Sequence, residues 1–230
     1  MLKEIKAWFL GSYRVKGVKA RVRGKLVEAI PSRAKVNLNF IPNYLYPLHS
    51  FLLKRKSYVG FEFWRINGST NYFLFAKDRR TLEEFTSQLN AIYPNLIFKE
   101  SILFPNLEKF ACGAYILLKN GIKSLAEFAY DPISHLLEAM QSNSILQILF
   151  KAEKSKNKQD LYFRILIRLI SSSNDAIQAR EIVERVTNSF SVFSKDFDFS
   201  IVRFPFFKNF LKRMIRRDFP LFLNFEYRKT

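Results

Sequence analysis

Cysteine and long apolar runs are both scarce in this sequence. Its 230 residues include a single cysteine, Cys112, which excludes an intramolecular disulfide and a multi-cysteine zinc site. No stretch approaches the roughly 18 apolar residues that a membrane-spanning helix needs. The first residues, MLKEIKAWFLGSYRVK, have too short an apolar run for a signal peptide. We therefore expect a cytoplasmic protein, with peripheral contact to an anionic membrane left open.

Acidic residues are few as well. The chain has 38 lysines and arginines against 20 aspartates and glutamates, so its net charge is +18 and its isoelectric point is about 10.0. A charge of this size does not specify a fold, but it favours polyanionic partners such as nucleic acid or an anionic membrane surface. The alternative is that the abundant Phe, Lys, Ile and Asn reflect an AT-rich genome and not a partner.

The sequence also lacks a recognisable catalytic motif. In GVKARVRGKL the glycine spacing is wrong for a phosphate-binding loop, and Leu26 stands where such a loop needs Ser or Thr to hold magnesium. The only histidines, His49 and His135, lie in expected helices without a third ligand or a nucleophile beside them. We therefore predict a protein that is not an enzyme and that has no metal, no cofactor and no small-molecule substrate.

One pattern of elements occurs twice along the chain. Residues 72–94 and 162–190 each indicate an aromatic-rich strand, a polar turn and an amphipathic helix. Asn67-Gly68 between two apolar runs predicts a tight hairpin, because both central residues of a type I′ turn need positive φ. Each half then follows the order β-α-β-β-α-β. The expected elements are 35–40, 46–55, 58–66, 71–78, 81–93 and 95–104 in the first half, and 113–119, 131–141, 145–153, 161–170, 174–193 and 198–204 in the second.

This order is typical of the ferredoxin-like split βαβ unit, in which helices cover one face of an antiparallel sheet. We predict an α+β fold of two tandem ferredoxin-like antiparallel units, followed by a C-terminal amphipathic helix and strand. The expected domains are a basic N-terminal arm or strand at 1–33, a first unit at 34–104, a second unit at 112–203, and the basic helix with the final strand at 204–230.

Local signals indicate where helices start and which faces are buried. Thr81 and Glu84 have the spacing of a capping box, and Pro47 suits the first turn of its helix. Cys112, with no histidine nearby, is expected to be a buried small hydrophobe. The helical period of apolar residues predicts a buried face for each of two helices. These faces are Leu82, Phe85, Leu89 and Ile92 in one helix, and Ile177, Ile182, Val183, Val186 and Phe190 in the other.

Two basic segments supply the candidate binding residues. The alternation in VKARVRGKL puts four cations on one face of a strand, where they would suit a phosphate backbone or, alternatively, protect an edge strand from aggregation. Residues 206–217 predict an amphipathic helix whose basic face would bind DNA or an anionic bilayer, or would simply remain solvated. The candidate nucleic-acid-binding residues are Arg14, Lys16, Lys19, Arg21, Arg23, Lys25, Lys208, Lys212, Arg213, Arg216 and Arg217.

Several segments, taken in order, resemble one family. VGFEFWRINGSTNYFLFAKDRRTLEEFTSQLNAIYPNLIF is similar to the amino-terminal region of the VirB4- and TraD-like conjugation ATPases of type IV secretion systems. DPISHLLEAM followed by LQILFKA resembles a later helix and strand of that region, and FRILIRLISSSNDAIQAREIVERVTNSF resembles the next strand and helix. FLKRMIRRDFP looks like the arginine-rich segment before the ATPase domain. The resemblance covers residues 58–220.

In that family a P-loop motor domain follows this region, and the present sequence contains no such motif. The resemblance therefore implies a non-catalytic accessory domain of a DNA-transfer motor. Such a domain would bind nucleic acid, a separately encoded motor ATPase, or both, and DNA is favoured over RNA as the nucleic acid.

A second and shorter resemblance points to RNA. KGVKARVRGKL with the later PLHSF is similar to the carboxy-terminal part of the small-subunit ribosomal KH-domain protein. It implies the alternative function, a ribosomal or ribonucleoprotein component that binds RNA, located in the cytoplasm or in an organelle matrix.

Overall fold

The structure is a computed structural model that describes residues 11–15, 24–30, 41–93, 96–101, 104–118, 132–140, 143–154, 162–192, 197–203 and 205–219. Over these residues the protein has an α+β fold with five α-helices and a nine-stranded sheet. All strand pairings in the sheet are antiparallel. None of the helices in the described parts of the chain is long and apolar enough to cross a bilayer.

The strands follow the order β1-β6-β8-β7-β3-β4-β2-β5, and β9 also pairs with β6. Their bounds are β1 Ser12–Arg14, β2 Lys25–Ile30, β3 Tyr58–Ile66, β4 Ser69–Ala76, β5 Ile97–Ser101, β6 Phe110–Leu118, β7 Ser144–Glu153, β8 Tyr162–Ser173 and β9 Phe197–Ile201. The helices are α2 Ile41–Arg55, α3 Arg79–Ile92, α4 Pro132–Ala139, α5 Ala176–Ser189 with a 3-10 turn at Phe190–Val192, and α6 Phe207–Arg216.

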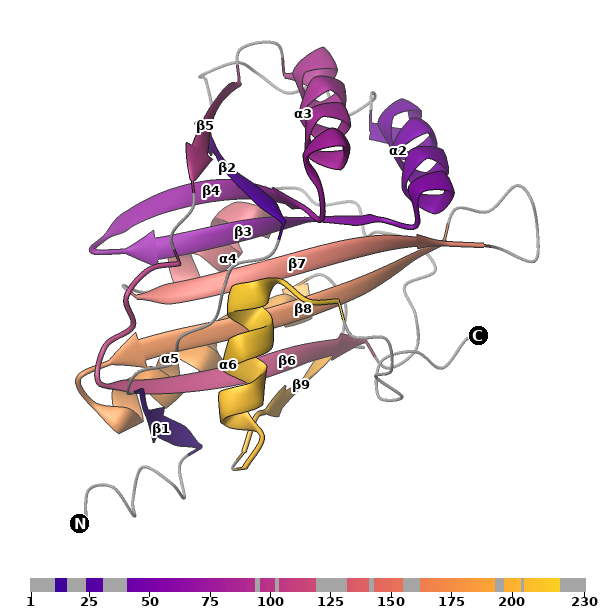
Figure 1. The fold of residues 1–230 in the computed structure, drawn as a ribbon. Coiled ribbons are helices and arrows are strands. Elements are labelled where there is room, and N and C mark those ends of the chain that lie inside the picture. Colours follow the sequence, from indigo (N-terminus) through magenta and orange to yellow (C-terminus); the bar gives the residue numbers. More distant parts are fainter. Residues whose placement is uncertain are drawn as a thin grey trace.

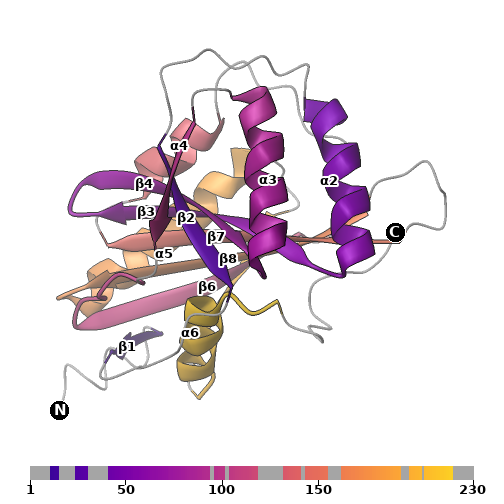
Figure 2. The same ribbon diagram turned by 45° about the horizontal axis from the view of Figure 1, so that its top comes forward.

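The two faces of the sheet are covered by different helices (Figure 1, Figure 2). Because side chains alternate along a strand, Phe73 and Phe75 of β4 pack in the same cluster as α6, whereas Leu74 and Ala76 pack with residues of α2 and α3. In the same way β6, β7 and β8 send alternate residues toward α4 and α5. Helix α6 therefore lies alone among the described helices on its face of the sheet.

Strands β3 and β7 join the first and second halves of the chain. They pair over eight positions, from Tyr58↔Lys151 to Arg65↔Ser144. The register also lines up one row of directly opposite residues across the middle of the sheet. In order, this row is Tyr115 on β6, Arg168 on β8, Gln147 on β7, Glu62 on β3 and Phe73 on β4.

Several sequence predictions are confirmed at the level of single residues. Asn67 and Gly68 both have positive φ, 49° and 82°, in the turn that joins β3 to β4. Cys112 is buried on β6. The whole apolar face predicted for the C-terminal helix is buried in α6, namely Phe207, Phe210, Leu211, Met214 and Ile215.

Three local predictions are wrong. Helix α2 begins at Ile41, so Pro47 lies inside it and not in its first turn. Helix α3 begins at Arg79, because the side chain of Asp78 accepts a hydrogen bond from Thr81 N and is the N-cap in place of Thr81. Ile177 is 38% exposed, because the buried stripe of α5 begins one residue earlier. That stripe contains Ala176, Ala179, Ile182, Val183 and Val186.

The strand predicted at 35–40, the final strand predicted after the C-terminal helix, and the side chain of Ile92 lie outside what the structure describes. The strand that lies between β4 and β5 is β2, which is the carboxy-terminal end of the alternating basic segment. The segment 1–33, predicted to be a basic arm or strand outside the first unit, thus supplies an interior strand of the sheet.

Candidate functional site

The candidate binding residues fall into separate places in the fold. Lys16, Lys19, Arg21 and Arg23 lie outside the described residues. Arg14 is exposed at the end of β1, where it is opposite Phe110 of β6. Lys25 is exposed at the start of β2, opposite Ala76 at the end of β4. The structure therefore places Arg14 on the first strand of the order and Lys25 on the second-to-last, so the two residues lie far apart across the sheet.

Helix α6 carries most of the remaining candidates on its outer face. Lys208 is exposed, and Lys212, Arg213 and Arg216 are partly exposed. The apolar face of α6 packs closely on the sheet, since the Phe210 ring lies at Gly113 so tightly that a Cβ there would be 2.3 Å from Phe210 Cε1. This close packing of the apolar face leaves the basic face of α6 turned outward.

Arg217 differs from the other candidates on this helix. It follows the last residue of α6 in a left-handed conformation, φ 57°, and its side chain turns inward and is fully buried. Its Nε and Nη2 donate to the two carboxylate oxygens of Glu62 at 2.6 and 3.1 Å. Arg217 is therefore a buried structural residue and is not available to a polyanion at the surface.

A cluster of exposed cations that the sequence interpretation did not single out lies where α2 ends and α3 begins. Lys54, Arg55 and Lys56 end α2, and Lys77, Arg79 and Arg80 surround the start of α3; all six side chains are exposed. Lys77 N donates to Tyr58 O at 3.3 Å, so the two segments lie side by side. We call these six residues the α2–α3 basic cluster. The runs KRK and KDRR are a sequence signal that could have identified it.

Asp78, the one acid within these two segments, orders the cluster. Burial opposes ionisation of its carboxyl, but hydrogen bonds from Thr81 and Ser57, with the nearby charge of Arg55, outweigh that effect and lower its pKa. Asp78 Oδ1 accepts from Thr81 N at 2.9 Å, and Oδ2 accepts from Ser57 Oγ at 3.3 Å. The resulting carboxylate fixes the end of α2 against the start of α3.

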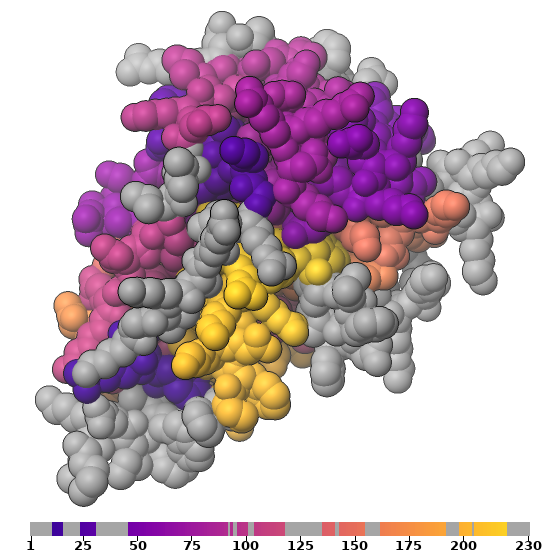
Figure 3. Space-filling view, in the orientation of Figure 1, coloured from indigo at the N-terminus to yellow at the C-terminus, as the bar shows by residue number. Residues whose placement is uncertain are grey.

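One predicted candidate, Lys25, and the carboxy-terminal end of α6 lie near the α2–α3 basic cluster. Lys25 is opposite Ala76, the residue before Lys77. On the other side, Tyr58 OH donates to Arg217 O at 3.0 Å, which holds the carboxy-terminal end of α6 beside the start of β3. In the space-filling view the yellow atoms of α6 adjoin the purple atoms of the first half (Figure 3). The carboxy-terminal end of α6 therefore lies beside the start of β3, the strand that follows α2.

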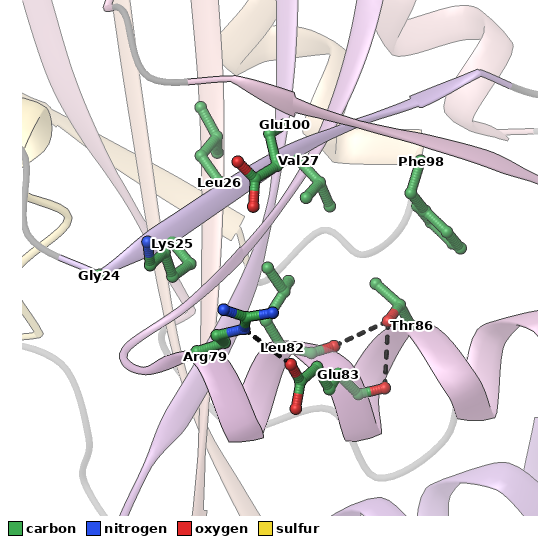
Figure 4. A pocket seen from close by; sticks show the side chains of 10 residues that line it. All are labelled: Gly24, Lys25, Leu26, Val27, Arg79, Leu82, Glu83, Thr86, Phe98 and Glu100. Carbon is green, nitrogen blue, oxygen red and sulfur yellow. Dashed lines mark hydrogen bonds and ion pairs between the residues drawn. The ribbon is translucent and has the colours of Figure 1, made fainter.

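An open hollow of about 360 Å³ lies between α3 and strands β2 and β5. Figure 4 shows Lys25 and Arg79 at one end of it and Phe98 at the other. Arg79 Nε is paired with Glu83 Oε1 at 2.8 Å. The hollow thus combines two cations with an apolar lining, and the carboxylates of Glu83 and Glu100 also line it.

The two histidines lie in different settings, and among the described residues neither belongs to a cluster that could hold a metal ion. His49 is buried, and its Nε2 lies 3.1 Å from Glu153 O and 3.0 Å from Tyr162 O, between the ends of β7 and β8. His135 is exposed on α4. No group of three or more His, Cys, Asp and Glu residues that could hold a metal ion occurs within the described parts of the chain.

The row of residues under α6 contains a buried polar network. Glu62 is fully buried and accepts four hydrogen bonds: two from Arg217, one from Trp64 Nε1 at 2.9 Å and one from Gln147 Nε2 at 2.6 Å. Gln147 Nε2 also donates to Met214 O of α6 at 3.2 Å. This network links α6 to β3 and β7. Sequence reasoning missed it because its members are scattered over 155 positions.

Comparisons with known proteins give weak likenesses only. No protein-family model and no curated protein matches the chain. One similar solved structure is an "Unknown Protein from Galdieria sulphuraria", with 12% sequence identity, a TM-score of 0.23, and coverage of 78% of this chain and 96% of that one. A second is a "Putative Chlorite dismutase", with 11% identity, a TM-score of 0.24, and coverage of 81% of this chain and 97% of that one. A third is a "putative monooxygenase from Lactobacillus acidophilus", with 10% identity, a TM-score of 0.23, and coverage of 78% of this chain and 92% of that one.

These likenesses correct one prediction. The sequence interpretation held that the protein is not an enzyme, whereas two of the similar structures are described as enzymes. The prediction that this chain has no catalytic activity is therefore withdrawn. The likenesses are too weak to transfer an activity, a substrate or a cofactor to this chain.

Proposed function

We propose that this protein binds nucleic acid through the surface formed by the α2–α3 basic cluster, Lys25 and the basic face of α6. The observation that carries the proposal is the convergence of six exposed cations from two segments on one site, with a single acid among them. A polyanion gains most from such a surface, because each neutralised phosphate releases condensed counterions. The net charge of +18 supplies long-range attraction to the same partner.

The hollow beside Arg79 supports the same proposal. Phosphate groups would contact Lys25 and Arg79 at its basic end, and a base would lie against the apolar lining near Leu82 and Phe98. Stacking and apolar contact of bases add sequence-tolerant affinity to phosphate contacts. The carboxylates in the lining, Glu83 and Glu100, would accept hydrogen bonds from exocyclic amino groups of a base.

The proposed scaffold of this surface is a pair of tandem ferredoxin-like units. The order β3-β4-β2-β5 with α2 and α3, and the order β7-β8-β6-β9 with α4 and α5, both follow the second-third-first-fourth strand arrangement of that unit. The two units would meet at the β3–β7 pairing. The basic cluster then lies at one end of the first unit, where its two helices meet the sheet.

We place this binding activity in a DNA-transfer machine, with a separately encoded motor ATPase as the protein partner. The support is the ordered resemblance of residues 58–220 to the amino-terminal region of conjugation ATPases. In this proposal the DNA follows the basic surface while the motor moves it. An RNA preference would instead favour the ribonucleoprotein function that the shorter resemblance implies.

Fluorescence anisotropy with labelled single-stranded DNA, double-stranded DNA and RNA over a salt series tests the proposal. The test variant carries Lys56→Ser, Lys77→Ser and Arg80→Ser, and the control carries Lys109→Ser, Arg185→Ser and Arg203→Ser. All six side chains are exposed, so both variants lose the same charge. We expect the slope of log K against log salt to fall by about 2–3 units in the test variant alone. An equal fall in slope in both variants would mean that binding depends on net charge alone and not on this surface. Absence of binding at low salt would refute the proposal.

A further inference from the structure

Arg168 is a buried cation to which the described residues offer no hydrogen-bond partner. It lies on β8 in the middle of the sheet, is fully buried, and has no partner for Nε, Nη1 or Nη2 among the described residues. Burial lowers the pKa of Arg168 to about 10, against the opposing influence of Tyr115, Glu62, Tyr58 and Asp218. The side chain is therefore still charged at neutral pH. Buried guanidinium groups are normally paired, because their desolvation is costly.

The neighbouring carboxylate has no capacity left for Arg168. A carboxylate offers about four acceptor positions, and Glu62 already accepts hydrogen bonds from Arg217, Trp64 and Gln147 at both oxygens. Its charge is matched by the two-point pair with Arg217. Among the described residues, the fully buried charged groups under α6 thus comprise two guanidiniums and one carboxylate. The carboxylate of Asp218, whose charge also acts on Arg168, is partly exposed.

Next to these donors lies an acceptor that also has no partner within the described parts of the chain. Gln147 is directly opposite Arg168 in the β7–β8 register, so their Cβ atoms are about 5 Å apart on the same face. Gln147 uses its Nε2 in bonds to Glu62 and Met214, and its Oε1 is buried with no partner among the described residues. A guanidinium and an amide oxygen are thus both unsatisfied at one place between the sheet and α6.

We propose that Arg168 and Gln147 bind a small organic oxyanion that carries a hydroxyl group. The oxyanion, a carboxylate or a phosphate, accepts hydrogen bonds from the Arg168 guanidinium, and the hydroxyl donates to Gln147 Oε1. A planar guanidinium suits a two-oxygen acceptor of this kind. One bound negative charge would balance the excess positive charge of the fully buried groups under α6. This ligand site is separate from the basic surface proposed for nucleic acid and does not depend on it.

Helix α6 would cover the bound molecule. Its Phe210 ring packs on Gly113 of β6, and its carboxy-terminal end is held by the Glu62–Arg217 pair and by the Tyr58 hydroxyl. Entry of the ligand requires α6 to move away from Arg168, and binding favours its return. A ligand of this site should therefore stabilise the folded protein as a whole, because it binds the closed state and not the unfolded chain.

Thermal unfolding of the extensively dialysed protein tests the proposal. The probes are lactate, acetate and inorganic phosphate, each compared with chloride at equal ionic strength. For the preferred anion, at about a hundred times its dissociation constant, we expect the wild-type melting temperature to rise by about 5–10 °C. Lactate above acetate would identify a hydroxycarboxylate, and a larger effect of phosphate would identify a phosphate ester. No anion-specific shift in the wild type would overturn the proposal.

Two variants assign the effect to the site. Arg168→Met removes the excess charge, so we expect it to be at least as stable as the wild type in chloride and to lose the anion shift. Arg185→Met removes an exposed cation of α5 and should keep the full shift. An equal shift in the wild type and Arg168→Met would overturn the proposal. If Arg168→Met does not fold, Arg168→Gln takes its place, and calorimetric titration of the wild type decides: saturable heat with the preferred anion supports the site, and none refutes it.

Discussion

Glu62 and Arg217 are 155 positions apart in the chain, yet they form a two-point ion pair in which both side chains are fully buried. The pair ties the residue after α6 to the middle of β3. Breaking such a pair by removing one partner is strongly destabilising, because the other charge stays buried without compensation. The two partners should nevertheless not be equivalent, since Arg168 lies in the same row of the sheet.

Glu62→Gln should destabilise the protein more than Arg217→Met. The Glu62 variant leaves two buried guanidiniums without a carboxylate, at a cost of about 3–5 kcal/mol in the free energy of unfolding. The Arg217 variant frees two acceptor positions on Glu62, which Arg168 can then use, so its cost should be lower by about 1 kcal/mol or more. Urea unfolding of both variants measures the difference. Equal costs would mean that Arg168 does not exchange partners with Arg217.

The side chain of Asp78 should contribute to stability in a pH-dependent way. As the N-cap of α3 it accepts from Thr81 N, and Asp78→Ala should cost about 1–2 kcal/mol at pH 7. Its pKa in the folded protein is lowered from 3.8. The stability that the Asp78 carboxylate contributes is therefore fully present above its unfolded pKa of about 4, and it is lost as the pH falls from there through the folded pKa.

Unfolding of the wild type, Asp78→Ala and Asp78→Asn in urea at pH 7 and pH 3 measures this contribution. Asparagine is also a good N-cap, so Asp78→Asn should retain most of the stability at pH 7. The difference between the wild type and Asp78→Ala should shrink at pH 3. A difference that is the same at both pH values would contradict the role assigned to the carboxylate.

The sequence predicted the buried face of α6 and the β3–β4 turn correctly, because these depend on neighbours in the chain. The apolar period of α6 identified Phe207, Phe210, Leu211, Met214 and Ile215 as its buried face, and Asn67-Gly68 identified the β3–β4 turn. Both signals are local. They hold whatever the rest of the chain does.

The polar row could not be predicted in the same way. Arg164 and Arg168 lie four residues apart on β8 and look alike in the sequence, yet Arg164 is partly exposed and paired with Glu153, whereas Arg168 is fully buried. The difference arises because α6, which begins some 40 residues later, covers one position and not the other. Pairing between distant strands decides which of the alternating residues are buried in the core. The α2–α3 basic cluster likewise forms only when two separate segments of the chain come together.

The thiol of Cys112 should be unreactive in the folded protein. Burial raises its pKa from 9.0 to about 12, and thiolate is the reactive form. At pH 8 we expect labelling by Ellman's reagent to be slow in buffer and fast in urea. Because the folded pKa is the higher one, the unfolded thiol ionises first, so this group should lower stability as pH rises above 9. Fast labelling in buffer would show that β6 opens beside α5 in the folded state.

Gly113→Ala tests how α6 is seated on the sheet. A Cβ at this position would lie 2.3 Å from Phe210 Cε1 and 3.0 Å from Phe210 Cδ1, and the Phe210 ring is buried with little room to shift. Overpacking of this kind costs about 1–3 kcal/mol, which urea unfolding would detect. Shortening the opposing side chain should relieve the clash, so Gly113→Ala with Phe210→Leu should be more stable than the sum of the two single changes predicts. Simple additivity would mean that α6 does not rest on Gly113 through Phe210.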